Sequence, residues 1–324
     1  MMQPASIAKG ETAVTATVEY PQLRLGIAPD SWGVWFADDP KQVPWSTYLD
    51  EIRAAGYTWT ELGPFGYLPT DPVRLRDELD RRGLTLTGGT VFAGLHRGPS
   101  ALEQAKRDCD TEAATLVPLG ARHLVILPEG YTDLDGNLTQ SPDLTDDQWH
   151  DLNAGMSELG RHVAETHGLE LVFHSHADSH VGTGAQIARF LDGTDPRYVS
   201  LCLDTGHVEY CGGDNLALIR DYPDRIRYVH LKQVDPAIRR RAMAEHLGFA
   251  PAVRLGVMVE PPLGEPDMPS LLAALGAFGR DLYCIVEQDM YPCPPDRPLP
   301  IARRTWSYFA GCGLATRGAS GARP

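Results

Sequence analysis

The sequence of 324 residues lacks the cysteine pairs, long apolar runs and positive charge that mark several protein classes. Its six cysteines include no CxxC pair, and several lie in apolar segments, which is typical of reduced, buried thiols in a cytoplasmic protein. No apolar run approaches the roughly 18 residues of a membrane span, and no basic start precedes an apolar block. A formal net charge of −14 opposes binding to nucleic acid or anionic membranes. We therefore expect a cytoplasmic protein with no nucleic-acid partner and no membrane partner.

The sequence also lacks a glycine-rich phosphate-binding loop. No GxGxxG pattern follows the first predicted strand, which counts against a dinucleotide-binding domain. No glycine-rich segment with Lys or Arg follows the seventh or eighth predicted strand, which counts against a phosphorylated substrate.

Short apolar segments that favour strands alternate with amphipathic segments that favour helices. The eight predicted strands are residues 23–28, 57–63, 84–92, 123–130, 169–176, 198–204, 225–232 and 282–289. The predicted helices are residues 45–56, 71–83, 99–119, 145–167, 184–192, 213–221, 268–279 and 298–312. Strands rich in Val, Ile and Leu, each followed by a helix, imply a parallel sheet covered on both faces. Eight such repeats predict a single-domain α/β protein, a (β/α)8 TIM barrel.

The predicted barrel spans residues 23–312, between a flexible amino-terminal arm, residues 1–22, and a flexible tail, residues 313–324. Residues 236–269, after the seventh predicted strand, form an insertion longer than a connection requires. We expect this insertion to be a lid or an interface element. A homo-oligomer is compatible with the sequence, which leaves the oligomeric state open.

The last four predicted strands each end in a residue that can bind a metal ion: His174, Asp204, His230 and Glu287. In this fold the carboxyl ends of the strands converge on the active site. Two imidazoles and two carboxylates suit Mn²⁺, Co²⁺, Fe²⁺ or Zn²⁺ better than Ca²⁺, and leave positions for a chelating substrate. One such residue has an ordinary explanation as a helix cap or hydrogen-bonding group. Four in succession do not, because an unpaired buried charge is costly.

Other polar residues lie at the same strand ends and predict a pocket that recognises hydroxyl groups: Glu61, Glu129, His176, His180, His207 and Lys232. Because side chains alternate along a strand, Lys232 faces the same side as His230. Candidates for an apolar wall are Trp32, Trp35 and Phe92. Core packing explains each of these three aromatic residues equally well.

Five segments, in this order, resemble the xylose isomerase-like barrel superfamily of sugar isomerases and epimerases. They are TELGPFGYLP, LVFHSHADSHVGT, LCLDTGHVEYCGGD, YVHLKQVDP and IVEQDMYP. Within that superfamily they most resemble the inosose dehydratases of inositol catabolism, over residues 23–312. The HLKxVDP and VEQDM segments are the more specific ones, since LDTGH is shared across the superfamily.

The resemblance implies roles for individual residues. Asp204, His230 and Glu287 match metal ligands, and His174 stands where the superfamily usually has a glutamate. His207 matches a substrate contact, and Lys232 matches a residue that reaches a substrate oxygen. Epimerases of this superfamily exchange protons between two facing glutamates, so His at position 174 favours a dehydratase.

We therefore expect a metal-dependent dehydratase of an inosose, a cyclic polyol with one ketone. A base, Glu287 or Glu61, removes the α-proton, an acid, His207 or His176, protonates the departing β-hydroxyl, and Lys232 stabilises the developing oxyanion. The expected cofactor is a divalent ion, Mn²⁺ or Co²⁺ first, with Zn²⁺, Fe²⁺ or Mg²⁺ as alternatives. Competing hypotheses are a keto-sugar isomerase or epimerase, a C-glycoside-cleaving subunit, an endonuclease, which the acidic charge disfavours, and a non-catalytic binding barrel.

Overall fold

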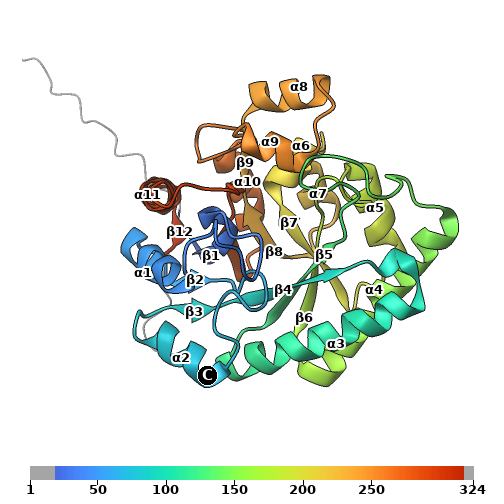
Figure 1. The fold of residues 1–324 in the computed structure, drawn as a ribbon, viewed down its shortest axis with the longest axis horizontal. Helices are drawn as coiled ribbons and strands as arrows, with labels where there is room; N and C mark the ends of the chain where they lie inside the picture. The colour runs from blue at the N-terminus through green and yellow to red at the C-terminus, as the bar shows by residue number, and fades with distance from the viewer. Residues whose placement is uncertain (1–18, 317–324) are drawn as a thin grey trace, which may run out of the picture.

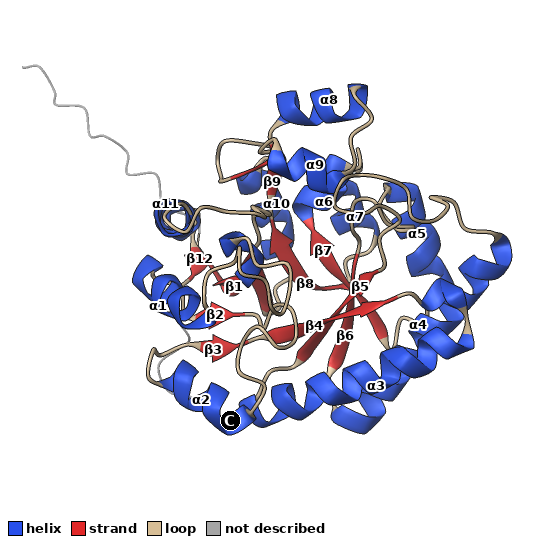
Figure 2. Ribbon diagram, in the orientation of Figure 1, coloured by secondary structure: helices blue, strands red, loops and turns tan. Residues whose placement is uncertain are grey.

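The computed structural model describes residues 19–316 and shows a parallel sheet curled into a barrel with helices outside (Figures 1 and 2). The strand order is β3-β2-β1-β11-β8-β7-β6-β5-β4, and β12 pairs with β1. Only Thr87 separates β3 (Thr85–Leu86) from β4 (Gly88–Ala93), so the two ends of this order meet along the chain. If β3 and β4 are counted as one interrupted strand, the barrel has the eight strands that the sequence predicts. The prediction of a TIM barrel is confirmed.

Seven other strands of this sheet lie close to the predicted segments. They are β1 (Tyr20–Ile27), β2 (Trp59–Thr60), β5 (His123–Pro128), β6 (Glu170–His174), β7 (Val199–Asp204), β8 (Ile226–Leu231) and β11 (Leu282–Val286). The short strand β12 (Leu314–Ala315) was not predicted and falls in the segment expected to be a flexible tail. The second strand is much shorter than predicted, but the residues after it stay beside β4, since the Leu62 N–H donates to the Gly88 carbonyl at 3.0 Å and Pro64 forms an isolated parallel bridge with Thr90.

Most of the helices begin at a residue whose side chain caps them. The helices are α1 (Trp45–Ala55), α2 (Pro72–Asp80), α3 (Pro99–Leu116), α4 (Asp146–His167), α5 (Gly184–Gly193), α6 (Thr205–Tyr210), α7 (Asn215–Asp221), α8 (Pro236–Ala244), α9 (Phe249–Arg254), α10 (Met268–Gly276) and α11 (Pro298–Gly311). Among them, α1, α3, α9 and α11 have no side-chain cap. Thr145 and Thr183 form capping boxes at the starts of α4 and α5, and Asp71 caps α2. The short helix α6 was not predicted. It begins directly after β7, with Asp204 as its cap.

The core has an inner and an outer layer. Inside the barrel, six buried side chains pack together: Ala28, Val125, Val172, Cys202, Tyr228 and Ile285. Alternate residues of the same strands face outward and pack against the helices, as in the stacking of Phe173 on Phe190 from α5. All six cysteines are free thiols, which confirms that they form no disulfide framework.

The insertion of residues 236–269 contains α8, α9 and β10 (Met258–Val259). β10 pairs antiparallel with β9 (Gln233–Val234), which follows β8. The proposed arm and tail lie mostly outside the described residues. Within the described part, residues 20–22 belong to β1 and residues 314–315 form β12. Over residues 19–316, no helix combines the length and apolar character needed to span a membrane.

Candidate metal centre and pocket

The four predicted metal ligands come from four neighbouring strands, β6, β7, β8 and β11. His174 and Asp204 end β6 and β7, His230 is the penultimate residue of β8, and Glu287 directly follows β11. The carboxyl ends of adjacent parallel strands meet at one face of the barrel. One ligand atom from each of the four residues therefore lies within 4.8 Å of the others, in a group able to hold a metal ion.

The spacing of these atoms fits a common ion. Asp204 Oδ2 lies 3.2 Å from His174 Nε2 and 3.7 Å from His230 Nδ1, while Glu287 Oε2 lies 3.7 Å and 3.0 Å from the same two nitrogens. Neighbouring ligands that are each about 2.1 Å from a divalent transition metal lie about 3.0–3.4 Å apart. The four ligand atoms therefore have about the spacing of such a metal site without rearrangement of the backbone.

Glu61 orients one of the imidazoles. Its Oε1 lies 2.8 Å from His230 Nε2, and both side chains are buried. Nδ1 of His230 is buried and has no hydrogen-bond partner among the described residues. A carboxylate that accepts the N–H of one ring nitrogen leaves the other nitrogen as a free ligand atom. Glu61, predicted as a candidate base, is therefore placed to position His230.

Lys232 lies beside the same carboxylates. Its Nζ is 3.3 Å from Asp204 Oδ2, 3.0 Å from Glu287 Oε2 and 2.8 Å from Asp289 Oδ2. Gly206 explains how the lysine passes α6, since a Cβ at that position would lie 2.4 Å from Lys232 Cγ. The glycine of the LDTGH segment thus permits the approach of Lys232 to the metal centre.

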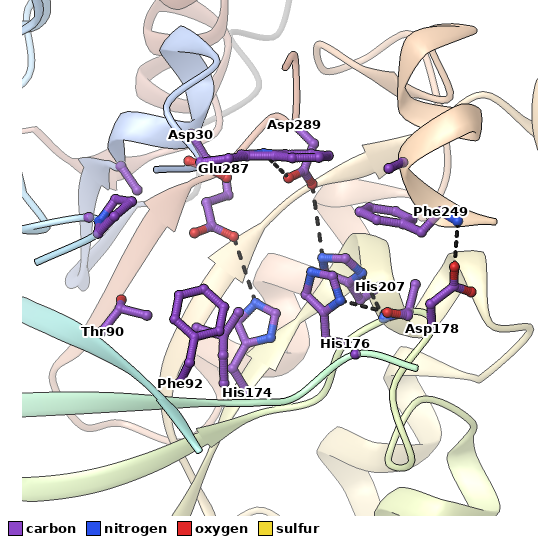
Figure 3. A pocket seen from close by; sticks show the side chains of 18 of the residues that line it. Asp30, Thr90, Phe92, His174, His176, Asp178, His207, Phe249, Glu287 and Asp289 are labelled. Carbon is purple, nitrogen blue, oxygen red and sulfur yellow. Dashed lines mark hydrogen bonds and ion pairs between the residues drawn. The ribbon is translucent and has the colours of Figure 1, made fainter. Parts of the chain in front are cut away.

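Two of the four predicted ligands, His174 and Glu287, line a cavity of about 490 Å³ at the mouth of the barrel (Figure 3). The predicted residues that line this cavity are Glu61, His174, His176, His207, Lys232, Glu287, Trp35 and Phe92. The ring of Phe92 is largely exposed at the edge of the pocket, and Trp35 donates its indole N–H to Asp289 Oδ1 at 3.1 Å. These residues come from seven segments spread along the chain, which the fold brings to one place.

Three residues predicted to bind substrate do not line the cavity. Trp32 is buried and its indole N–H bonds to Glu51, so this ring packs in the core. Glu129 forms an ion pair with Arg97, and the ring nitrogen Nε2 of His180 lies 2.9 Å from the carbonyl of Ser141. Each of these side chains has a partner that is not among the residues lining the cavity, and a role in substrate binding stays a prediction for these three positions.

Two neutral imidazoles face the carboxylates across the pocket. The rings of His176 and His207 lie with their centroids 3.9 Å apart and their planes tilted by 37°. Burial lowers the pKa of His176 to about 4 and that of His207 well below its ordinary value. Nδ1 of His207 accepts the backbone N–H of Ala177 at 3.1 Å, so the ring proton lies on Nε2. His207 therefore presents a proton donor.

Sequence reasoning missed several residues of the pocket. Asp289 lies two residues beyond Glu287, so the alternation that was applied to Lys232 would have found it. Asp30 follows β1; its Oδ1 is buried without a hydrogen-bond partner among the described residues, and burial of the carboxyl raises its pKa well above the ordinary value. Phe249 of the insertion lies 4.8 Å from the His207 ring, between centroids, and its backbone N–H bonds to Asp178 Oδ2 at 2.6 Å (Figure 3). No local pattern could place Phe249 there.

With this geometry established, comparison with known proteins identifies the class. The family model described as "Xylose isomerase-like TIM barrel" matches residues 49–306, and the chain belongs to this family. Its curated relatives include the inosose dehydratase of Lacticaseibacillus casei, 33% identical over 296 residues that cover 89% of this chain and 96% of that protein. The inosose dehydratase of Salmonella typhimurium strain LT2 is 31% identical over 290 residues, covering 87% and 93%. The chain is accordingly an enzyme of the hydro-lyase class.

Solved structures show the same fold at low sequence identity. The IolI protein with a bound zinc atom has a TM-score of 0.67 and 16% identity, with 88% of this chain and 97% of that chain covered. An L-ribulose 3-epimerase has a TM-score of 0.65 and 18% identity, with 90% and 94% covered. At these identities the likeness concerns the barrel architecture.

Proposed function

We propose that this protein is a metal-dependent dehydratase of an inosose. The observation that carries the proposal is the asymmetry of the pocket. Glu287 and Asp289 lie on one side, two neutral imidazoles lie on the other, and Lys232 lies between them. Elimination of water needs two groups of different chemistry, a base that removes the α-proton and an acid that protonates the leaving hydroxyl. The curated relatives support the same assignment.

In the proposed reaction Glu287 is the base. Burial opposes its ionisation, but the charges of His230 and Lys232 hold the pKa of Glu287 well below the ordinary value, so it is a carboxylate. It takes the α-proton, the electron pair of that C–H bond forms the C=C bond, and the β C–O bond breaks. His207 Nε2 gives its proton to the leaving oxygen, which departs as water, and Lys232 Nζ, 3.2 Å away, returns a proton to Nε2 so that the imidazole stays neutral. Lys232 Nζ donates to the ketone oxygen while negative charge develops there.

A divalent ion held by His174, Asp204, His230 and Glu287 would polarise the ketone and stabilise this negative charge. We propose Mn²⁺ or Co²⁺ as the ion, with Zn²⁺, Fe²⁺ and Mg²⁺ as alternatives that the mixed nitrogen and oxygen donor set also accepts. The zinc atom of the IolI structure is in keeping with such a set. We further propose a role in inositol catabolism in the cytoplasm, on a small polyhydroxylated ketone.

The second candidate is an isomerase or epimerase of a keto-sugar, favoured by the shared barrel and by the carboxylates of the pocket. His174 occupies the end of β6 and lies 3.2 Å from Asp204, so it does not supply a second carboxylate facing Glu287. A symmetric exchange of protons between two glutamates therefore has no counterpart here. This makes elimination the better-supported reaction.

The test uses metal-free protein, 2-keto-myo-inositol and added Mn²⁺, Co²⁺ or Zn²⁺, with the product followed by ultraviolet absorbance and identified by NMR. We expect metal-dependent growth of an enol or dione band and formation of a dehydrated product. A product with the mass of the substrate and an inverted carbon would instead establish an epimerase. Protein that is shown to bind the ion and forms no product from this ketone would contradict the inosose assignment.

A further inference from the structure

A second group of metal-binding side chains lies on the outside of the barrel. Asp110 is on α3, and His162 and His167 are on α4, two helices that pack against each other along the barrel (Figure 2). None of these residues lines the pocket at the barrel mouth. The group therefore belongs to a different part of the molecule from the proposed active site.

The three side chains converge on one point. Nε2 of His162 and Nε2 of His167 each lie 2.7 Å from the same oxygen, Asp110 Oδ1. The two imidazole planes meet at 83° with their centroids 5.9 Å apart, so the rings approach the carboxylate from different directions. A single His–carboxylate pair needs only one ring. Two imidazole N–H groups that donate to one oxygen give these contacts without an ion, and the three ligand atoms also lie close enough together to share one.

The surroundings leave room for an ion and for water. The side chains of Asp110, His162 and His167 are 46%, 23% and 19% exposed. The 2.7 Å separations are shorter than the about 3.0–3.4 Å expected between ligands of one ion. Asp110 must therefore withdraw by a few tenths of an ångström, which its half-exposed side chain allows. Among the described residues its ion-pair partners are these two histidines, so no lysine or arginine competes for the site.

We propose that Asp110, His162 and His167 form a second site for a divalent transition-metal ion, with water completing the coordination. Two imidazoles and one carboxylate favour Zn²⁺, Co²⁺ or Ni²⁺ over Mg²⁺ and Ca²⁺. The ion joins α3 to α4 and stabilises the packing of these helices. Its role is structural, and it contributes no group to the reaction.

The test measures, by equilibrium dialysis, how many Zn²⁺ ions the full-length chain binds. The wild type is compared with the variants His162→Ala, His167→Ala and Asp204→Ala. The matched control is His150→Ala, since His150 is also exposed on α4 but lies outside the group. We expect two equivalents in the wild type and in His150→Ala. Loss of either ligand histidine should leave one equivalent, and so should Asp204→Ala.

The outcomes separate this proposal from the proposed function. Equal zinc content in the wild type, His162→Ala and His167→Ala would overturn the proposal of a second site. If Asp204→Ala alone lost one equivalent, the proposal of a metal centre at the barrel mouth would still stand. Conversely, an equivalent lost only with the two histidines would support the outer site and refute the metal centre. Far-ultraviolet circular dichroism establishes that each variant is folded. Zinc should also raise the melting temperature of Asp204→Ala, and this rise should disappear when His167→Ala is added.

Discussion

Replacing Glu61 by Gln tests whether this residue acts through His230. The carboxylate fixes the tautomer of the imidazole, because Oε1 accepts from Nε2 at 2.8 Å and leaves Nδ1 facing the metal centre. Glutamine keeps the size of the side chain but loses its charge, and its amide can present N–H groups to the ring. Loss of such an outer partner typically weakens metal binding about 10–100-fold, or about 1.4–2.8 kcal/mol. We expect an effect of that size on the dissociation constant.

The measurement is competition for Zn²⁺ or Mn²⁺ between the protein and a chelator of known affinity. Glu129→Gln is the matched control, since Glu129 also directly follows a barrel strand but pairs with Arg97 instead of a metal ligand. Metal affinity in Glu129→Gln should equal that of the wild type. Turnover of Glu61→Gln at saturating metal should largely recover, because the base of the proposed reaction is Glu287.

Two results would refute this reasoning. An unchanged metal affinity in Glu61→Gln would show that the contact with His230 does not set the ligand tautomer. Normal metal affinity together with a loss of turnover that no metal concentration restores would instead make Glu61 the base. The second result would return Glu61 to one of the roles predicted from the sequence.

Three further predictions follow from the described contacts. Asp204→Ala should abolish binding at the barrel centre and turnover, whereas His207→Ala should keep that ion and lose about 10²–10⁴-fold in kcat, as metal analysis and kinetics will show. Burial raises the pKa of Glu112 well above its ordinary value, so its contribution to stability is full below the unfolded pKa and is lost as the pH rises through the folded pKa. The melting temperature of Glu112→Gln, relative to the wild type, should therefore increase as the pH is raised. Phe173→Ala removes a fully buried ring stacked on Phe190 and should cost about 3–5 kcal/mol of unfolding free energy in denaturant titrations; a cost below about 1 kcal/mol would contradict the packing described.

The barrel and the grouping of the four candidate metal ligands could be predicted because both depend on local pattern. Each strand is a short apolar run, and parallel strands bring their carboxyl ends to one face whatever the details of the loops. His174, Asp204, His230 and Glu287 needed only this rule. Asp289 obeyed the same rule and was overlooked.

The rest of the pocket depends on contacts between distant segments. Phe249 reaches the site because Gly248 lies against Gly136, where a Cβ on Gly248 would be 2.6 Å from the Gly136 Cα. Trp32 shows the opposite failure, since it lies near a strand end but the short helix η1 (Pro29–Trp32) turns its ring into the core. Neither the docking of the insertion nor the direction of that turn is encoded in a nearby pattern.

The charges around Lys232 explain why this convergence of strand ends favours a divalent ion. Three carboxylates, Asp204, Glu287 and Asp289, lie within 3.3 Å of one ammonium group. Burial opposes protonation of His174 and His230, but their anionic neighbours raise the pKa of both imidazoles, so these rings balance the remaining negative charge when no ion is bound. An ion of charge +2 that takes the two rings as neutral ligands supplies the same balance, whereas a monovalent ion does not. The carboxylates proposed to bind the ion therefore also hold Lys232 in place.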